Sequence, residues 1–148
     1  GASVAVGEST VMVGAPGVKS GELFAAGAVY VFGLEGGSWS EQAKLTPSDP
    51  VDYGVFGWDI AISDSVAVIG APGGLYEVAG AAYVFRYDGA WVEEAKLVAS
   101  APAAHYVDYS FMGASVGIDA EMITAGAPFD SGTGEDFRTG ASYVFRSA

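Results

Sequence analysis

The chain has 148 residues, no cysteine, and 18 Asp and Glu against 6 Lys and Arg, which gives a net charge of −12. This charge argues against nucleic acid and anionic membrane surfaces as partners, and the lack of cysteine excludes disulfides, cysteine zinc sites and thiol nucleophiles. The most apolar stretch, FAAGAVYVFGL at 24–34, is shorter than the ~18 residues of a membrane-spanning helix, so we expect no membrane insertion.

The N-terminal third of the chain predicts four β-strands. The segments SVAV and TVMVGAP, at 3–6 and 10–16, are rich in β-branched residues and are separated by a short polar gap, as in a β-hairpin. AVYVF at 28–32 is apolar throughout, which predicts a strand buried on both faces. SWSEQAKL at 38–45 alternates, which predicts an outer strand with one wet side. One face of this strand would carry Trp39, Glu41, Ala43 and Leu45.

These elements recur along the chain. Gly-Ala-Pro stands at 14–16, 70–72 and 126–128, so its glycines are 56 residues apart (70 − 14 and 126 − 70). The third strand recurs as AAYVF and ASYVF, and the outer strand recurs once, as WVEEAKL at 91–97. A fixed period of about this length is typical of a repeat architecture.

We therefore predict an all-β fold of about three β-propeller blades, each of four antiparallel strands. Radially packed blades bury their inner strands on both faces and leave the outermost strand in solvent. The blades would span 1–56, 57–112 and 113–148, the last without its outer strand. Gly-Ala-Pro would end the second strand of each blade, because Pro has no N–H to donate and Gly permits close approach of another backbone.

The pairing of Phe56-Gly57 with the three Gly-Ala-Pro segments resembles the FG-GAP repeat of integrin α-subunit propellers and of many bacterial surface proteins. The resemblance covers essentially the whole chain, and copy three departs from it with Phe111-Met112 before Gly113. It implies a seven-bladed, usually extracellular propeller that binds proteins or glycans. Many family members also carry a calcium loop between the first two strands. That role does not carry over, because GEST, SDSV and DAEM offer too few carboxylates.

Three blades would leave two blade faces bare, each rich in Val, Tyr and Phe, and large bare apolar faces indicate an interface. Either the chain is part of a longer array, or several copies close a ring. Two copies of three blades would give six blades with two-fold symmetry, which is the commonest kind, so we expect a homodimer.

The loops after Gly-Ala-Pro differ most between copies, and repeat proteins place binding on such a face. We expect ligand contacts there from Glu22, Tyr76, Glu77, Asp130 and Asp136. A solvated acidic loop is the simpler interpretation of 129–139, and a weak calcium site there would use Asp130, Glu135 and Asp136. We expect no other cofactor.

Other candidate residues favour structural roles. His105, the single histidine, has no nucleophile motif beside it. Asp52 and Asp108 are equivalent, which indicates a repeated structural hydrogen bond. Trp39 and Trp91 could stack on sugars or pack between blades.

The sequence thus predicts a non-enzymatic extracellular or cell-surface module for adhesion, which binds protein or carbohydrate through the loops after Gly-Ala-Pro. One alternative is a purely structural segment of a larger surface protein. Another is a glycosidase or lyase on a propeller scaffold, although no carboxylate is set apart as acid or base. Because fold analogy alone is weak support for a function, all three remain open.

Overall fold

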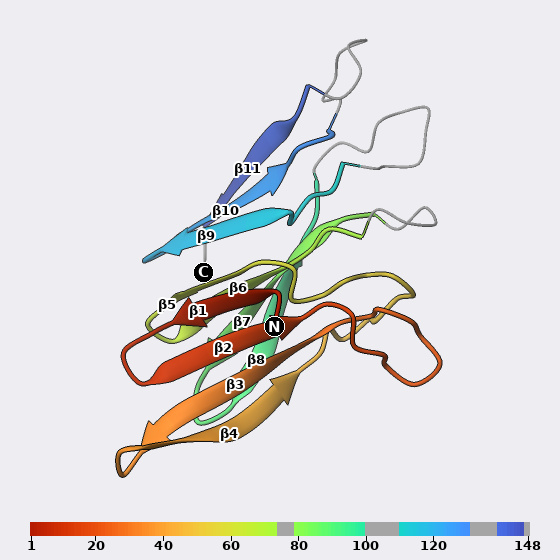
Figure 1. Cartoon of the computed structure of the whole chain (residues 1–148). Helices are drawn as coiled ribbons and strands as arrows, with labels where there is room; N and C mark the ends of the chain where they lie inside the picture. The colour runs from red at the N-terminus through yellow and green to blue at the C-terminus, as the bar shows by residue number, and fades with distance from the viewer. Residues whose placement is uncertain (74–78, 100–109, 131–138, 147–148) are drawn as a thin grey trace.

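A computed structural model describes residues 1–73, 79–99, 110–130 and 139–146 of the chain. These residues form three antiparallel sheets and contain no helix, so none of them forms a helix that could cross a membrane. Figure 1 shows the sheets one after another along the chain, each lying against the next. The predicted all-β class and the antiparallel, blade-like sheets are confirmed, and the sheets are called blades 1, 2 and 3 below.

Each blade has its strands in chain order across the sheet. Blade 1 consists of β1 (Ser3–Val6), β2 (Thr10–Ala15), β3 (Ala28–Glu35) and β4 (Ser38–Leu45). Blade 2 consists of β5 (Ile60–Ser63), β6 (Val66–Ala71), β7 (Ala81–Tyr87) and β8 (Trp91–Leu97). Blade 3 consists of β9 (Ser115–Asp119), β10 (Met122–Ala127) and β11 (Ala141–Arg146). The second strand of each blade ends at the Ala of Gly-Ala-Pro, as predicted.

Blade 2 is buried on both faces because alternate side chains of its strands enter two different cores. Ala67 and Ile69 of β6 pack against blade 1, in a core that also holds Met12 and Val31 of that blade. Val66 and Val68, on the other face of β6, pack against Ile123 and its neighbours in blade 3. The innermost strands β1, β5 and β9 also contact one another in that order. These contacts give the radial order expected of propeller blades, without showing a closed ring.

A chain of glycines runs through both seams between the blades. The Gly57 amide donates to the Gly70 carbonyl of its own blade over 3.0 Å, and the Gly57 carbonyl lies against Gly14 of blade 1. A Cβ on Gly14 would lie 2.1 Å from that carbonyl oxygen, and a Cβ on Gly70 would lie 2.0 Å from the Gly113 oxygen. Gly113 in turn donates to Gly126 over 3.0 Å. In blades 1 and 2 the Gly of Gly-Ala-Pro therefore admits the backbone of the next blade.

The outer strands differ from the prediction of simple alternation. In both β4 and β8 the register shifts by one residue against the third strand, so that Gln42 and Glu94 are extra residues of a β-bulge. A bulge reverses which residues share a face. Trp91 consequently packs toward blade 1, whereas Ala95 and Leu97 pack toward blade 3. The predicted grouping of Trp39 and Glu41 with Ala43 and Leu45 is therefore wrong.

The two outer faces of the array differ in composition. The face of blade 1 that points away from blade 2 is mostly apolar, whereas the face of blade 3 that points away from blade 2 is largely polar. On blade 1 the pairing and the bulge place there Val4, Val6, Val11, Val13, Tyr30, Phe32, Leu34 and Trp39, together with Glu41 and Lys44. On blade 3 the pairing places there Ser115, Gly117, Asp119, Met122, Thr124, Gly126, Ser142, Val144 and Arg146. The expectation of two bare faces rich in Val, Tyr and Phe is right for blade 1 and wrong for blade 3.

Candidate functional site

The connection after the second strand of blade 1 and the linker between blades 1 and 2 lie at one end of the array. Figure 1 shows the loop at 16–27 beside the linker at 46–59, at the right of the view. The hairpin turns between the first and second strands lie at the other end. We call the first end the loop end.

The first loop and the first linker are joined by backbone hydrogen bonds. The amides of Tyr53, Val55 and Phe56 donate to the carbonyls of Phe24, Ala25 and Ala26, over 2.7, 2.9 and 3.0 Å. The Asp52 carboxylate accepts the Phe24 amide over 2.6 Å, which is the structural role predicted for it. The linker is therefore paired with the last residues of the loop, and the two segments together form one side of the loop end.

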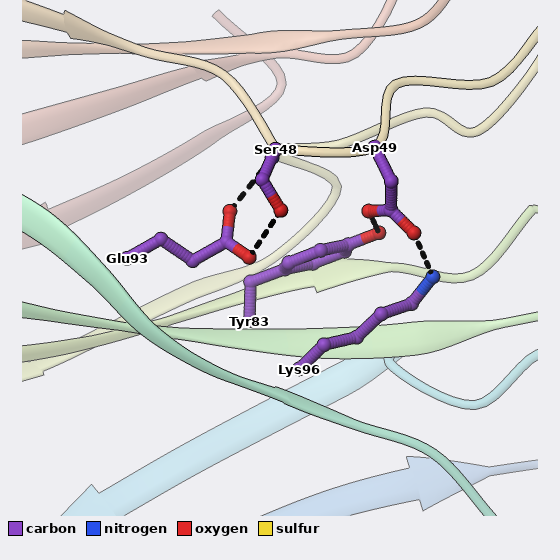
Figure 2. Close-up of polar contacts among 5 residues, drawn as sticks. All are labelled: Ser48, Asp49, Tyr83, Glu93 and Lys96. Atoms are coloured by element: carbon purple, nitrogen blue, oxygen red, sulfur yellow. Dashed lines mark hydrogen bonds and ion pairs between the residues drawn. The ribbon is translucent and has the colours of Figure 1, made fainter.

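The linker is also held to the outer strands of blade 2 (Figure 2). The Ser48 amide and hydroxyl both donate to the Glu93 carboxylate, each over 2.7 Å. The Tyr83 hydroxyl donates to Asp49 over 2.8 Å, and the Lys96 ammonium bonds the other Asp49 oxygen over 2.6 Å. We call these five residues the linker clamp. It fixes the linker that follows β4 of blade 1 onto β7 and β8 of blade 2.

The linker clamp fixes the protonation of its members. Burial acts to raise the pKa of Asp49, but the hydrogen bonds from Lys96 and Tyr83 outweigh it, so the pKa is lowered and the carboxylate stays ionised. Burial, with the adjacent Asp49 carboxylate, raises the pKa of the Tyr83 hydroxyl far above its ordinary value, so this hydroxyl stays protonated. Neither group is available as a proton donor or acceptor that changes state near neutral pH.

A cavity of about 300 Å³ lies under the linker, between blades 1 and 2. Its lining is mainly apolar, and three residues of the linker clamp, Asp49, Tyr83 and Lys96, also line it. The residues that line it include Ala26, Val51, Phe56, Ala81, Tyr83 and Lys96. A small apolar cavity with a few converging polar groups is the usual form of a ligand site, and this volume is at the lower end of the range for such sites.

Of the residues expected to bind ligand, the structure describes Glu22 and Asp130, and neither lines this cavity. Glu22 is exposed at the tip of the first loop, beside the bridge between Ser20 and Leu23. Asp130 is 5% exposed and accepts a hydrogen bond from the Tyr143 hydroxyl, so its carboxylate supports blade 3 from within. Tyr76, Glu77, Glu135, Asp136, His105 and Asp108 lie outside the described residues.

The predicted cation site stays a prediction. Within the four described ranges, no three His, Asp or Glu side chains are placed to hold a metal ion together. The calcium prediction for 129–139 depends on Glu135 and Asp136, which the structure does not describe.

Sequence reasoning missed the linker clamp. Its signal was present as a repeated pair, because Tyr83 and Lys96 of blade 2 correspond to Tyr30 and Lys44 of blade 1. In both blades the ammonium lies over the tyrosine ring, 5.4 and 5.6 Å from its centroid. Asp49, however, follows β4 with no counterpart in the sequence pattern, so its role depends on the fold.

These features define a class of protein, an array of blade-like β-repeats joined by a glycine contact at each seam. The family model described as FG-GAP repeat matches residues 39–85, which confirms the resemblance over that segment: the chain carries an FG-GAP repeat there. The match begins in β4 and ends in β7, so the repeat unit straddles the first seam and contains Phe56-Gly57. A search of curated proteins found no match.

Proposed function

We propose that the chain is a non-enzymatic binding module of β-propeller type, which acts outside the cell or at its surface and recognises a protein or a carbohydrate through its loop end. The cavity under the first linker is the observation that carries the proposal. It combines an apolar wall with an ionised carboxylate, an ammonium and a tyrosine ring. Neutral glycans and polar protein groups suit this combination, since sugars present both hydroxyls and apolar ring faces.

The protonation states support binding rather than catalysis. A glycosidase of the usual kind needs one carboxylic acid with a raised pKa beside a second, ionised carboxylate. At this cavity the Asp49 pKa is lowered and the Tyr83 pKa is raised away from neutrality. Hydrolase or lyase activity would therefore need groups other than the linker clamp.

A screen of immobilised glycans and matrix proteins with the whole chain tests the proposal. A ligand found there is then measured against Val51→Trp, which places a large side chain at the cavity, since Val51 is 42% exposed on its lining. Val92→Trp is the matched control, because Val92 is 63% exposed on β8 away from the cavity. We expect Val51→Trp to weaken binding at least tenfold and Val92→Trp to leave it unchanged. Equal affinity of both variants would contradict a loop-end site at this cavity.

A structural role in a larger assembly is the second candidate, and the apolar outer face of blade 1 favours it. We propose that another blade covers this face, in a homodimer or in a longer array. Large bare apolar faces are rare on soluble monomers, and blade 2 buries the equivalent face against blade 1. A chain with only this role would fail to bind in the screen and would still associate through blade 1.

A further inference from the structure

A second pocket, of about 320 Å³, opens between blades 1 and 2 at the end of the array opposite the loop end. The hairpin turns that join β1 to β2 and β5 to β6 contribute residues to it, and Figure 1 shows both turns at the left of the view. The pocket shares no lining residue with the cavity under the linker. It is therefore a separate candidate site.

The blade 1 side of this pocket depends on a glycine in β3. Gly33 lies on the face of β3 that points to blade 2, two residues beyond Val31 of the core. A Cβ on Gly33 would lie 2.0 Å from the side-chain nitrogen of Gln42, so the Gln42 amide lies directly on the Gly33 backbone. The same nitrogen donates to the Glu35 carboxylate over 3.0 Å. This bond uses one of the two N–H groups of the amide and one of the two carboxylate oxygens, so a ligand would find both a donor and an acceptor here.

The blade 2 side of the pocket supplies an aromatic wall and a carboxylate. Tyr87 and Trp91 pair across β7 and β8, and their ring centroids are 5.4 Å apart at an angle of 49°. Trp91 is partly buried against the core of the first seam, which fixes its ring, and Tyr87 is 47% exposed. Asp64, in the turn before β6, is exposed and lines the same pocket.

The second seam lacks these features. The blade 2 residues equivalent to Gly33 and Gln42 are Arg86 and Glu94, whose side chains form an ion pair over 3.0 Å. Blade 3 has Ala120 at the position of Asp64, and the described residues of blade 3 include no strand equivalent to β8 and hence no aromatic wall. The pocket is therefore particular to the first seam, and the repeated packing of the blades does not account for it.

The lining of this pocket matches the chemistry of a neutral sugar ring. The Glu35 and Asp64 carboxylates can accept hydrogen bonds from hydroxyl groups, and such charge-assisted bonds are stronger than neutral ones. Donors are also present, in the Gln42 amide and in the hydroxyls of Ser9 and Ser65, which line the pocket as well. A hexose offers hydroxyls that both donate and accept, and an apolar C–H face for an aromatic ring. An organic cation would leave the donors without partners, and an anionic sugar would be repelled by the two carboxylates.

We propose that this pocket binds one neutral hexose unit, with an apolar face of the sugar ring against Trp91. The hydroxyls of the sugar bond the Gln42 amide and the carboxylates of Glu35 and Asp64. The two carboxylates also set the specificity, because they disfavour a uronic acid of the same configuration. This site is a second one, and it does not depend on the function proposed for the loop end.

Simple methyl glycosides test the proposal. The probes are the methyl glycosides of glucose, galactose and mannose, titrated into the whole protein and followed by ligand-observed NMR. We expect at least one of them to bind saturably with a Kd below about 10 mM. We expect the methyl glycoside of the matching uronic acid to bind at least about tenfold more weakly. No saturable binding of the three hexosides, or tighter binding of the uronic acid or of choline, would overturn the proposal.

Two exposed residues locate the site with matched controls. Gln42→Ala removes the amide and should weaken hexoside binding about three- to tenfold, whereas Glu94→Ala, at the equivalent bulge outside the pocket, should leave it unchanged. Asp64 has a φ of 49°, which Asn tolerates, so Asp64→Asn removes the charge and keeps the turn. It should reduce the discrimination against the uronic acid at least about threefold, an effect that a merely structural role of Asp64 would not produce. Asp119→Asn, at an exposed position of blade 3, is its control.

Two further variants test the aromatic wall and the independence of the site. Trp91→Ala should remove hexoside binding, and Gln42→Ala keeps the test decisive if Trp91→Ala fails to fold. Val51→Trp, which fills the loop-end cavity, should leave hexoside binding unchanged, so the failure of either site is seen separately. Hexoside binding that Gln42→Ala and Asp64→Asn leave unchanged, or that Val51→Trp removes, would place the sugar elsewhere and overturn the proposal.

Discussion

The outer faces of blades 1 and 3 show how far two copies of one repeat can differ. Blade 1 turns Val, Tyr, Phe, Leu and Trp outward beside Glu41 and Lys44, and blade 3 turns Ser, Gly, Thr, Val and Met outward beside Asp119 and Arg146. On blade 2 the equivalents of both faces are buried, with Ile69, Tyr83 and Phe85 on one and Val68, Ala82 and Val84 on the other. The backbone pattern is therefore common to all three blades, and the side chains decide which face can associate by apolar contact.

The largest effect should come from removing the same aromatic ring at a covered and at a bare face. Phe85 is 3% exposed and lies in the first seam at an edge-on angle to Phe56, whereas Phe32, its equivalent, is only partly buried on the bare face of blade 1. We expect Phe85→Ala to lower the free energy of unfolding by about 3–5 kcal/mol. Phe32→Ala should lower it by about 1 kcal/mol, because less area returns to water. Urea unfolding of dilute protein measures both.

Equal losses in the two variants would break the comparison. They would mean that the blade 1 face is already covered in dilute solution, by a second chain or by residues outside the described ranges. Repeating the measurement at higher protein concentration separates these cases, since only association depends on concentration.

A charge placed on each outer face should have an intermediate effect, on association. Val6 of blade 1 is 69% exposed and Val144 of blade 3 is 63% exposed, so either can be changed with little effect on folding. We expect the wild-type chain to form a dimer in light scattering. Val6→Glu should weaken association about a hundredfold, or about 2.7 kcal/mol, since an unpaired charge would be buried. Val144→Glu should weaken it less than tenfold, because the blade 3 face contributes little apolar area.

The effects of Val6→Glu and Val144→Glu also distinguish the two ways in which two chains could associate. A six-bladed ring joins the blade 1 face of one copy to the blade 3 face of the other, so both variants would act. Association through two blade 1 faces would respond to Val6→Glu alone. A monomeric wild-type chain would contradict the homodimer in either form.

The sequence predicts the strands well because the copies repeat them, and it predicts burial poorly because burial depends on neighbours. Tyr-Val-Phe occurs in β3, β7 and β11, yet only in β7 are all three residues buried. Only blade 2 has a described blade on both sides. The faces of Trp39 and Trp91 could not be predicted, because the alternation of side chains in the sequence gives no sign of the β-bulges at Gln42 and Glu94.

The candidate site was harder to predict than the strands. Sequence variation directed attention to the loops after Gly-Ala-Pro, and in the described part the linker at 46–59 lines more of the cavity than the loop does. Asp49 reaches Tyr83 and Lys96 across 34 and 47 residues of chain. Contacts over such separations are set by how blades pack, which one copy of the repeat does not encode.

The smallest effect should come from the linker clamp, where Tyr83 lies at the first seam and its equivalent, Tyr30, lies on the bare face of blade 1. Tyr83 donates to Asp49, whereas Tyr30, its equivalent on blade 1, has no counterpart of Asp49 among the residues that the structure describes. We expect Tyr83→Phe to lower the free energy of unfolding by about 0.5–1.5 kcal/mol and Tyr30→Phe to leave it nearly unchanged. Similar losses in both variants would show that the hydrogen bond from Tyr83 to Asp49 adds no stability.

The pH dependence of stability gives the linker clamp a signature that a packing defect would lack. The Asp49 pKa is lower in the folded state than the ordinary ~3.9, so the folded state binds this proton less readily and the contribution is complete above that value. It is lost as pH falls through the folded pKa. The Tyr83 pKa is raised above the ordinary ~10, so its contribution is complete below pH ~10 and is lost at more alkaline pH. The difference in unfolding free energy between wild type and Asp49→Asn should therefore be constant from about pH 5 to 9 and should shrink below pH ~4. The ion pair with Lys96 is half exposed, so 0.5 M salt should reduce that plateau only slightly. A plateau that salt abolishes would mean that the charge pair, rather than the partly buried hydrogen bond from Tyr83, holds the linker.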